Sequence, residues 1–189
     1  EGLRLAWRWN ERDRLLLSLP LFHMHGLGVG LHGTLHTGGS AVLFDGFRPD
    51  ELLAAIEPFA ATLFFGVPTM YHRLADHPQA ARLAKLRLCV SGSAPLPAAL
   101  HAALQKTSGQ RILERYGMTE TLMLVSNPHD GERRAGSAGL PLPGVEVEAE
   151  LVLHYPDGEL LAHAVGYVGR INEQELAEID RVNYSGTHL

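Results

Sequence analysis

The sequence contains a single cysteine, Cys89, among its 189 residues. One cysteine excludes an internal disulfide framework and any metal site built from several thiolates. Because Cys89 lies inside the apolar run Leu86–Val90, we expect it to be a core residue rather than a reactive thiol. Basic residues are not concentrated anywhere either, and the formal net charge of −5 argues against a nucleic-acid partner.

Long hydrophobic runs are absent as well. No apolar stretch is long enough to cross a bilayer, and no secretory leader is found at the start. We therefore expect a soluble protein of a reducing compartment, the cytoplasm, with no membrane partner. The chain contains 46% hydrophobic and 20% charged residues, a balance that allows a sizeable core.

Short apolar runs alternate with helical patterns along the first two thirds of the chain. Strands are predicted at 15–19, 40–44, 61–65, 86–90 and from 111 to a turn at Gly117, and helices at 27–35, 49–56, 68–74 and 98–106. This alternation is typical of an α/β fold, a parallel sheet with helices on both faces. A β-rich segment is expected after about residue 122, and residues 145–148 alternate like a half-exposed strand.

Thr119 and Glu120 would then stand at the C-terminal end of the fifth strand, where ligands gather in open α/β sheets. A hydroxyl can donate a hydrogen bond to a phosphate, and a carboxylate can hold Mg²⁺ beside phosphate oxygens. The pair therefore suits a nucleotide. A second interpretation stays open, because Thr-Glu after a strand is also a common helix start.

Four loops follow successive strands and would line one edge of the sheet: 22–26, 66–73, 91–95 and 116–121. They offer imidazole, guanidinium, hydroxyl and carboxylate groups, which together suit an anionic organic substrate beside a nucleotide. Singly, His23 and His25 are also typical of packing residues, Arg73 of a surface residue and Ser91–Ser93 of a plain turn. Their joint position at strand ends favours a binding site.

Five motifs resemble, in order and spacing, those of the AMP-forming acyl-CoA synthetases, and most of all the malonyl-CoA synthetases among them. They are LPLFHMHG at 19–26, GVPTMY at 66–71, SGSAPL at 91–96, ERYGMTET at 114–121 and GSAGLPLPGV at 136–145. The resemblance covers residues 1–150, which would be part of the adenylation domain. It implies activation of an acid by ATP to acyl-AMP and pyrophosphate, followed by transfer to the thiol of coenzyme A.

The resemblance also implies roles for individual residues. The nucleotide would be bound by residues of two loops: Ser93, Ala94, Glu114, Tyr116, Gly117, Met118 and Thr119. The distal carboxylate of malonate or methylmalonate would be held by His25, Arg73, Ser93 and Arg115. The catalytic residues would be His23, Thr119 and Glu120, with Glu120 as the Mg²⁺ ligand. A fixed guanidinium suits a dicarboxylate, because a monocarboxylic acid would leave it unpaired.

Parts of the family pattern are missing. The phosphate loop, the ribose-binding aspartate and the domain with the catalytic lysine do not occur in this sequence. We therefore expect a piece of an enzyme that is inactive by itself, with residues 151–189 as an unassigned tail. Two alternatives stay open: a synthetase for another small acid, and a non-catalytic nucleotide-binding module.

Overall fold

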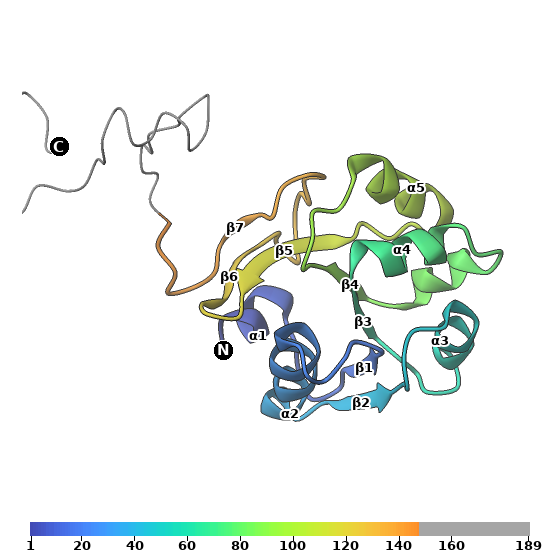
Figure 1. Cartoon of the computed structure of the whole chain (residues 1–189), viewed down its shortest axis with the longest axis horizontal. Helices are drawn as coiled ribbons and strands as arrows, with labels where there is room; N and C mark the ends of the chain where they lie inside the picture. Colours follow the sequence, from blue (N-terminus) through green and yellow to red (C-terminus); the bar gives the residue numbers. More distant parts are fainter. Residues whose placement is uncertain (148–189) are drawn as a thin grey trace, which may run out of the picture. The chain divides into compact units, whose positions relative to one another are not determined.

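The computed structural model describes residues 1–147, so the predicted tail 151–189 lies outside the described residues. Within 1–147, seven strands form one sheet in the order β2-β1-β3-β4-β5-β6-β7 (Figure 1). The parallel strands are β1 (Arg14–Leu17), β2 (Ser40–Leu43), β3 (Leu63–Gly66), β4 (Leu88–Ser91) and β5 (Leu113–Met118). β6 (Leu122–Ser126) and β7 (Leu140–Pro141) follow in antiparallel pairing. The predicted parallel sheet and the β-rich segment after it are confirmed.

The helices connect the strands largely as predicted. They are α1 (Gly2–Trp7), the π-helical η1 (His25–His32), α2 (Gly33–Thr37), α3 (Pro49–Ala55), α4 (Pro68–Ala75), the 3₁₀-helical η2 (Ala80–Lys85) and α5 (Ala98–Ser108). Proline opens both α3 and α4, where its missing N–H costs nothing because the first helical N–H groups have no partner within the helix. The predicted helix 27–35 corresponds to η1 and α2 together. It begins earlier than predicted, at His25, and α2 ends at Thr37, where Gly38 follows with a φ of +73°.

Hydrophobic side chains cover both faces of the sheet, because successive residues of a strand point to opposite sides. On β1, Leu16 packs with Leu52 of α3 and Leu104 of α5, and Leu15 packs with Trp7 and Val29. Figure 1 shows α3, α4 and α5 on one side of the sheet and α1 and α2 on the other. The predicted two-sided packing is confirmed.

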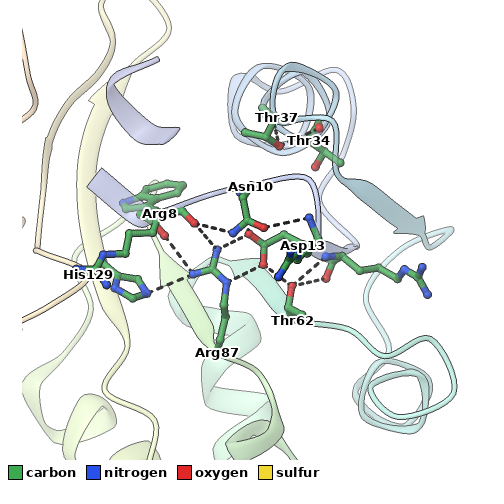
Figure 2. Close-up of polar contacts among 12 residues, drawn as sticks. Arg8, Asn10, Asp13, Thr34, Thr37, Thr62, Arg87 and His129 are labelled. Atoms are coloured by element: carbon green, nitrogen blue, oxygen red, sulfur yellow. Dashed lines mark hydrogen bonds and ion pairs between the residues drawn. The ribbon is translucent and has the colours of Figure 1, made fainter. Parts of the chain in front are cut away.

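A polar network joins the amino ends of three neighbouring strands (Figure 2). Asp13, Thr62 and Arg87 each stand one residue before a strand, namely β1, β3 and β4. Arg87 donates to both carboxylate oxygens of Asp13, with 2.6 Å from Nε to Oδ1, and Thr62 Oγ1 donates to the same Oδ1 at 2.8 Å. Burial raises the pKa of Asp13, but the hydrogen bonds from Arg87 and Thr62 lower it below its ordinary value. The network therefore stabilises the amino-end edge of the sheet, which is opposite the carboxyl edge.

The region after β5 differs from two predictions. Gly117 lies inside β5 rather than in a turn, and the chain turns at 119–121 into β6. A Cβ on Gly117 would lie 2.1 Å from the carbonyl oxygen of Leu122, so the hairpin itself requires glycine there. Residues 145–147 are irregular, so their predicted strand is wrong, and residue 148 is outside the described range.

Candidate functional site

Candidate residues from three elements converge at the carboxyl edge of the sheet. His25 follows β1, Ser93 follows β4, and Arg115 lies in β5. The parallel strand order 2-1-3-4-5 reverses direction beside β1, and open α/β sheets bind ligands at such a point. The edge chosen from the sequence is therefore the one where the fold gathers these side chains.

His25 and Ser93 are in direct contact although 68 residues separate them along the chain. Ser93 Oγ lies 3.2 Å from His25 Nδ1, and Nε2 of the buried imidazole has no hydrogen-bond partner among the described residues. Burial lowers the pKa of His25 to about 3, and the charges of Arg115 and His23 act in the same direction. The imidazole is thus neutral at physiological pH and offers its ring nitrogens as hydrogen-bonding groups.

Arg115 supplies the positive charge of the site. Its side chain is only 4% exposed, and among residues 1–147 its Nε and Nη2 find no acceptor. Burial lowers the pKa of Arg115 to about 10, so the guanidinium is still charged at neutral pH. A buried cation without a partner is costly, and an anion that binds it bidentately removes that cost.

Within β5, Arg115 lies on one face of the sheet and Glu114 and Tyr116 on the other. Leu113 packs on the α1 and η1 side of the sheet and Ile112 on the α5 side, so alternation places Arg115 on the first side and Glu114 and Tyr116 on the second. Glu114 is buried, and its Oε1 accepts a 3.0 Å hydrogen bond from the N–H of Leu96. Glu114 therefore ties the loop after β4 to β5.

The remaining nucleotide candidates are accessible. Tyr116 is 49% exposed and Met118 43%, and Ala94, Thr119 and Glu120 are exposed as well. Thr119 and Glu120 lie in the β5–β6 turn, so neither a helix start nor a simple strand end describes them. An aromatic ring, a hydroxyl and a carboxylate are thus presented to solvent on one hairpin.

Two predicted residues lie apart from His25, Ser93 and Arg115. The Arg73 guanidinium lies over the ring of Phe47, 5.1 Å from its centroid, on the exposed side of α4. His23 is exposed, with its ring 5.6 Å from that of Phe22, although its charge acts on His25. The structure brings His25, Ser93 and Arg115 to one place at the sheet edge, with a hydrogen bond only between His25 and Ser93, and it leaves Arg73 and His23 apart from them.

Gly92, between Ser91 and Ser93, was not among the predicted site residues, although glycine in these loops was expected to allow close approach to the backbone. Gly92 is buried, and the side chain of Arg115 lies against it. A signal was present, because a glycine directly after a strand often marks a place where another group approaches the backbone closely. Cys89 is buried as predicted, and burial raises the pKa of its thiol to about 12.

Residues 1–147 contain neither a cluster of metal-ligating side chains nor a helix that could span a membrane. No three histidine, cysteine, aspartate or glutamate side chains gather there into a metal-binding group. The single carboxylate of Glu120 is still compatible with Mg²⁺, because this ion commonly takes one or two carboxylates and completes its shell with phosphate and water oxygens. No helix of this part has both the length and the apolar character that a membrane span needs.

The pKa of His25 differs between the folded and the unfolded chain, so the stability of the protein is expected to depend on pH. The ordinary pKa is 6.5 and the folded value about 3, so unfolding takes up a proton between these pH values. The free energy of unfolding is expected to fall as the pH drops from about 6.5, by up to about 1.4 kcal/mol per pH unit from this group. Urea unfolding at pH 7, 6 and 5 measures it.

The matched variants are His25→Asn and His72→Asn, the latter at a side chain that is 67% exposed. His25→Asn should flatten the pH dependence, and His72→Asn should leave it as in the parent protein. Equal pH slopes for the parent protein and His25→Asn would contradict a neutral, buried imidazole.

Comparison with known proteins finds a matching family and several related ligases. The family model for AMP-binding enzymes matches residues 2–166. A mitochondrial malonate–CoA ligase of Mus musculus is 38% identical over 162 residues, which are 77% of this chain and 28% of the relative. A feruloyl-CoA synthase of an Amycolatopsis species is 40% identical over 134 residues, which are 68% of this chain and 27% of the relative.

Among solved structures, a malonyl-CoA ligase in a ternary product complex with methylmalonyl-CoA and AMP is similar. It is 50% identical, with a TM-score of 0.73, and the match covers 77% of this chain and 32% of that one. The chain thus spans about 30% of the length of the proteins it matches.

Proposed function

Because the chain belongs to the family of AMP-binding enzymes, we propose that it is the central part of the large domain of an ATP-dependent acid–thiol ligase. The acid is a small dicarboxylate, malonate or methylmalonate, and the acceptor is coenzyme A. The relatives named as malonate–CoA and malonyl-CoA ligases support this choice. A piece of this size is not expected to catalyse the reaction alone.

The unpaired Arg115 guanidinium is the observation that carries the proposal. Its Nε and Nη2 and the Nε2 of His25 are buried without partners within residues 1–147, and Ser93 adds a hydroxyl beside the imidazole. Such a set of donors fits a carboxylate that is held away from the reacting one. A monocarboxylic acid would leave the guanidinium unpaired, which is the kind of contact that gives strong discrimination.

The other candidate residues divide the remaining work by their positions. The exposed Tyr116 and the loop at Ser93–Ala94 would hold the adenine, and Thr119 would donate to the α-phosphate. Glu120 would hold Mg²⁺, which neutralises phosphate charge while the substrate carboxylate attacks the α-phosphate and pyrophosphate leaves. His23 would orient the attacking carboxylate, and the acyl group would then pass to the thiol of coenzyme A.

Pyrophosphate release by the whole protein tests the substrate. Malonate and methylmalonate are expected to support release, and acetate and ferulate to support little. Ferulate is included because a feruloyl-CoA synthase is among the relatives. If acetate or ferulate supports as much pyrophosphate release as malonate, the substrate is not specifically a dicarboxylate.

The second candidate function is a nucleotide-binding module without turnover, which the short span of the chain favours for the 189 residues as such. Calorimetry with ATP and Mg²⁺ separates the cases. Binding by the 189-residue chain without adenylate formation supports the module for this piece, and absence of heat argues against a nucleotide site in it.

We also propose a cytoplasmic location, because a lone buried thiol suits a reducing compartment. The mouse relative is named as mitochondrial, so the location is open to a direct test. Cell fractionation with an antibody against the chain would place the protein in one compartment or the other.

A further inference from the structure

Gly92 leaves a space that the side chain of Arg115 fills. A Cβ at position 92 would lie 2.3 Å from Cζ, 2.5 Å from Nε and 2.7 Å from Nη2 of Arg115. Real Cβ atoms essentially never approach another heavy atom within 3.0 Å. The guanidinium can therefore lie where it does only because residue 92 has no side chain.

The backbone gives no other reason for a glycine here. Gly92 is not among the residues with positive φ, so an alanine could adopt its conformation without strain. Its own N–H donates to the carbonyl of Gly66 at 3.3 Å, and the preceding Ser91 pairs with Glu114 across β4 and β5. These bonds hold the backbone at 92 in place between its neighbouring strands.

We propose that Gly92 is a positioning residue for Arg115 and thereby sets the preference for a dicarboxylate; this rests on the proposed function. The atoms that a Cβ would meet belong to the far end of a flexible side chain, so the guanidinium moves and the fold is kept. The shift must be at least 0.7 Å, the difference between 2.3 and 3.0 Å. Displacements of this size are enough to spoil a charge-to-charge fit.

The test is Gly92→Ala in the whole protein, with KM measured separately for malonate and for ATP. KM for malonate is expected to rise about tenfold to a hundredfold, while KM for ATP stays within about twofold. Thermal unfolding should show a melting temperature within a few degrees of the parent. A rise of both KM values together would mean a general distortion of the loop and would overturn the assignment.

A double-mutant cycle shows whether Gly92 acts through Arg115. In an Arg115→Met background the guanidinium is gone, so adding Gly92→Ala should leave KM for malonate unchanged. A further rise of KM in that background would overturn the inference. Two results distinguish the two proposals. Equal use of malonate and acetate by the parent protein would overturn both the dicarboxylate substrate and the positioning role of Gly92. A preference for malonate that persists in Gly92→Ala would overturn only the role of Gly92.

Discussion

Replacing Arg115 with methionine should lower kcat/KM for malonate by about 100- to 1000-fold, the usual loss when one partner of a buried charge pair is removed. Arg115 as a residue is 4% exposed and its Nε and Nη2 have no partner within residues 1–147, so a bound carboxylate would be its counter-charge. Steady-state pyrophosphate release over a range of malonate concentrations measures the change.

The same substitution should make the protein more stable. Burial lowers the pKa of Arg115 to about 10, which means that the folded protein disfavours the charged form. Methionine has a similar length and no charge, so the free energy of unfolding without substrate is expected to rise by about 1 kcal/mol or more. Urea unfolding would show it. A variant that is less active and less stable would instead mean that Arg115 serves the fold.

Arg12→Met and Arg73→Met are the comparisons for that experiment. Arg12 is exposed and stands two residues before β1, at the amino end of the strand rather than the carboxyl edge, so its loss should leave both kcat/KM and stability unchanged. Arg73 lies over Phe47, outside the His25–Ser93–Arg115 group. If its loss raises KM for malonate as strongly as the loss of Arg115, then Arg73 has the substrate-binding role that the resemblance implies and must move its side chain away from Phe47 to reach the substrate.

Asp13→Ala should lower the free energy of unfolding by about 3–5 kcal/mol, because it leaves Arg87 without its bidentate partner. The Asp13 carboxylate is 3% exposed and accepts hydrogen bonds from Arg87, Thr62 and the N–H of Asn10. The free energy of unfolding of a folded protein is usually only about 5–15 kcal/mol, so the variant should be close to unfolding. Its urea midpoint and melting temperature measure the loss.

The control for Asp13 is Glu51→Ala, which breaks the exposed ion pair of Glu51 with Arg48. The two side chains of that pair are 50% and 56% exposed, so a loss of about 1 kcal/mol or less is expected. Similar losses for the two variants would mean that the Asp13–Arg87 pair contributes no more than a surface contact.

The alternation of strands and helices that builds the parallel sheet could be predicted because its signals are local. Apolar runs of four or five residues lie between helical patterns, and Pro49 and Pro68 mark two helix starts that the structure confirms. Alternation along each strand then assigns residues to two faces without further information. The first helix was missed because residues 1–13 are mainly polar, although Trp7 and Trp9 are 0% and 2% exposed.

Contacts between distant positions could not be predicted in this way. Asp13 and Arg87 are 74 residues apart, and neither has a local pattern that identifies the other. Grouping the loops at one sheet edge placed Ser93 and His25 in the same region before the structure showed their contact. The burial of Arg115 on one face and of Glu114 on the other could be recognised only from the pairing of the strands in the structure. The turn at 119–121 was misplaced because Gly117 is required by close approach to Leu122 rather than by a bend.

Pro141 in β7 has a consequence for how molecules of this chain meet. The N–H of Leu142 donates to the carbonyl of Leu124 in β6, so position 141 faces the opposite, outer side of β7. Proline has no N–H to present there, and β7 itself is only Leu140–Pro141. Within residues 1–147 β7 is the last strand of the sheet, so a strand from a second molecule would find a missing donor there, which discourages the edge-to-edge association that leads to aggregates.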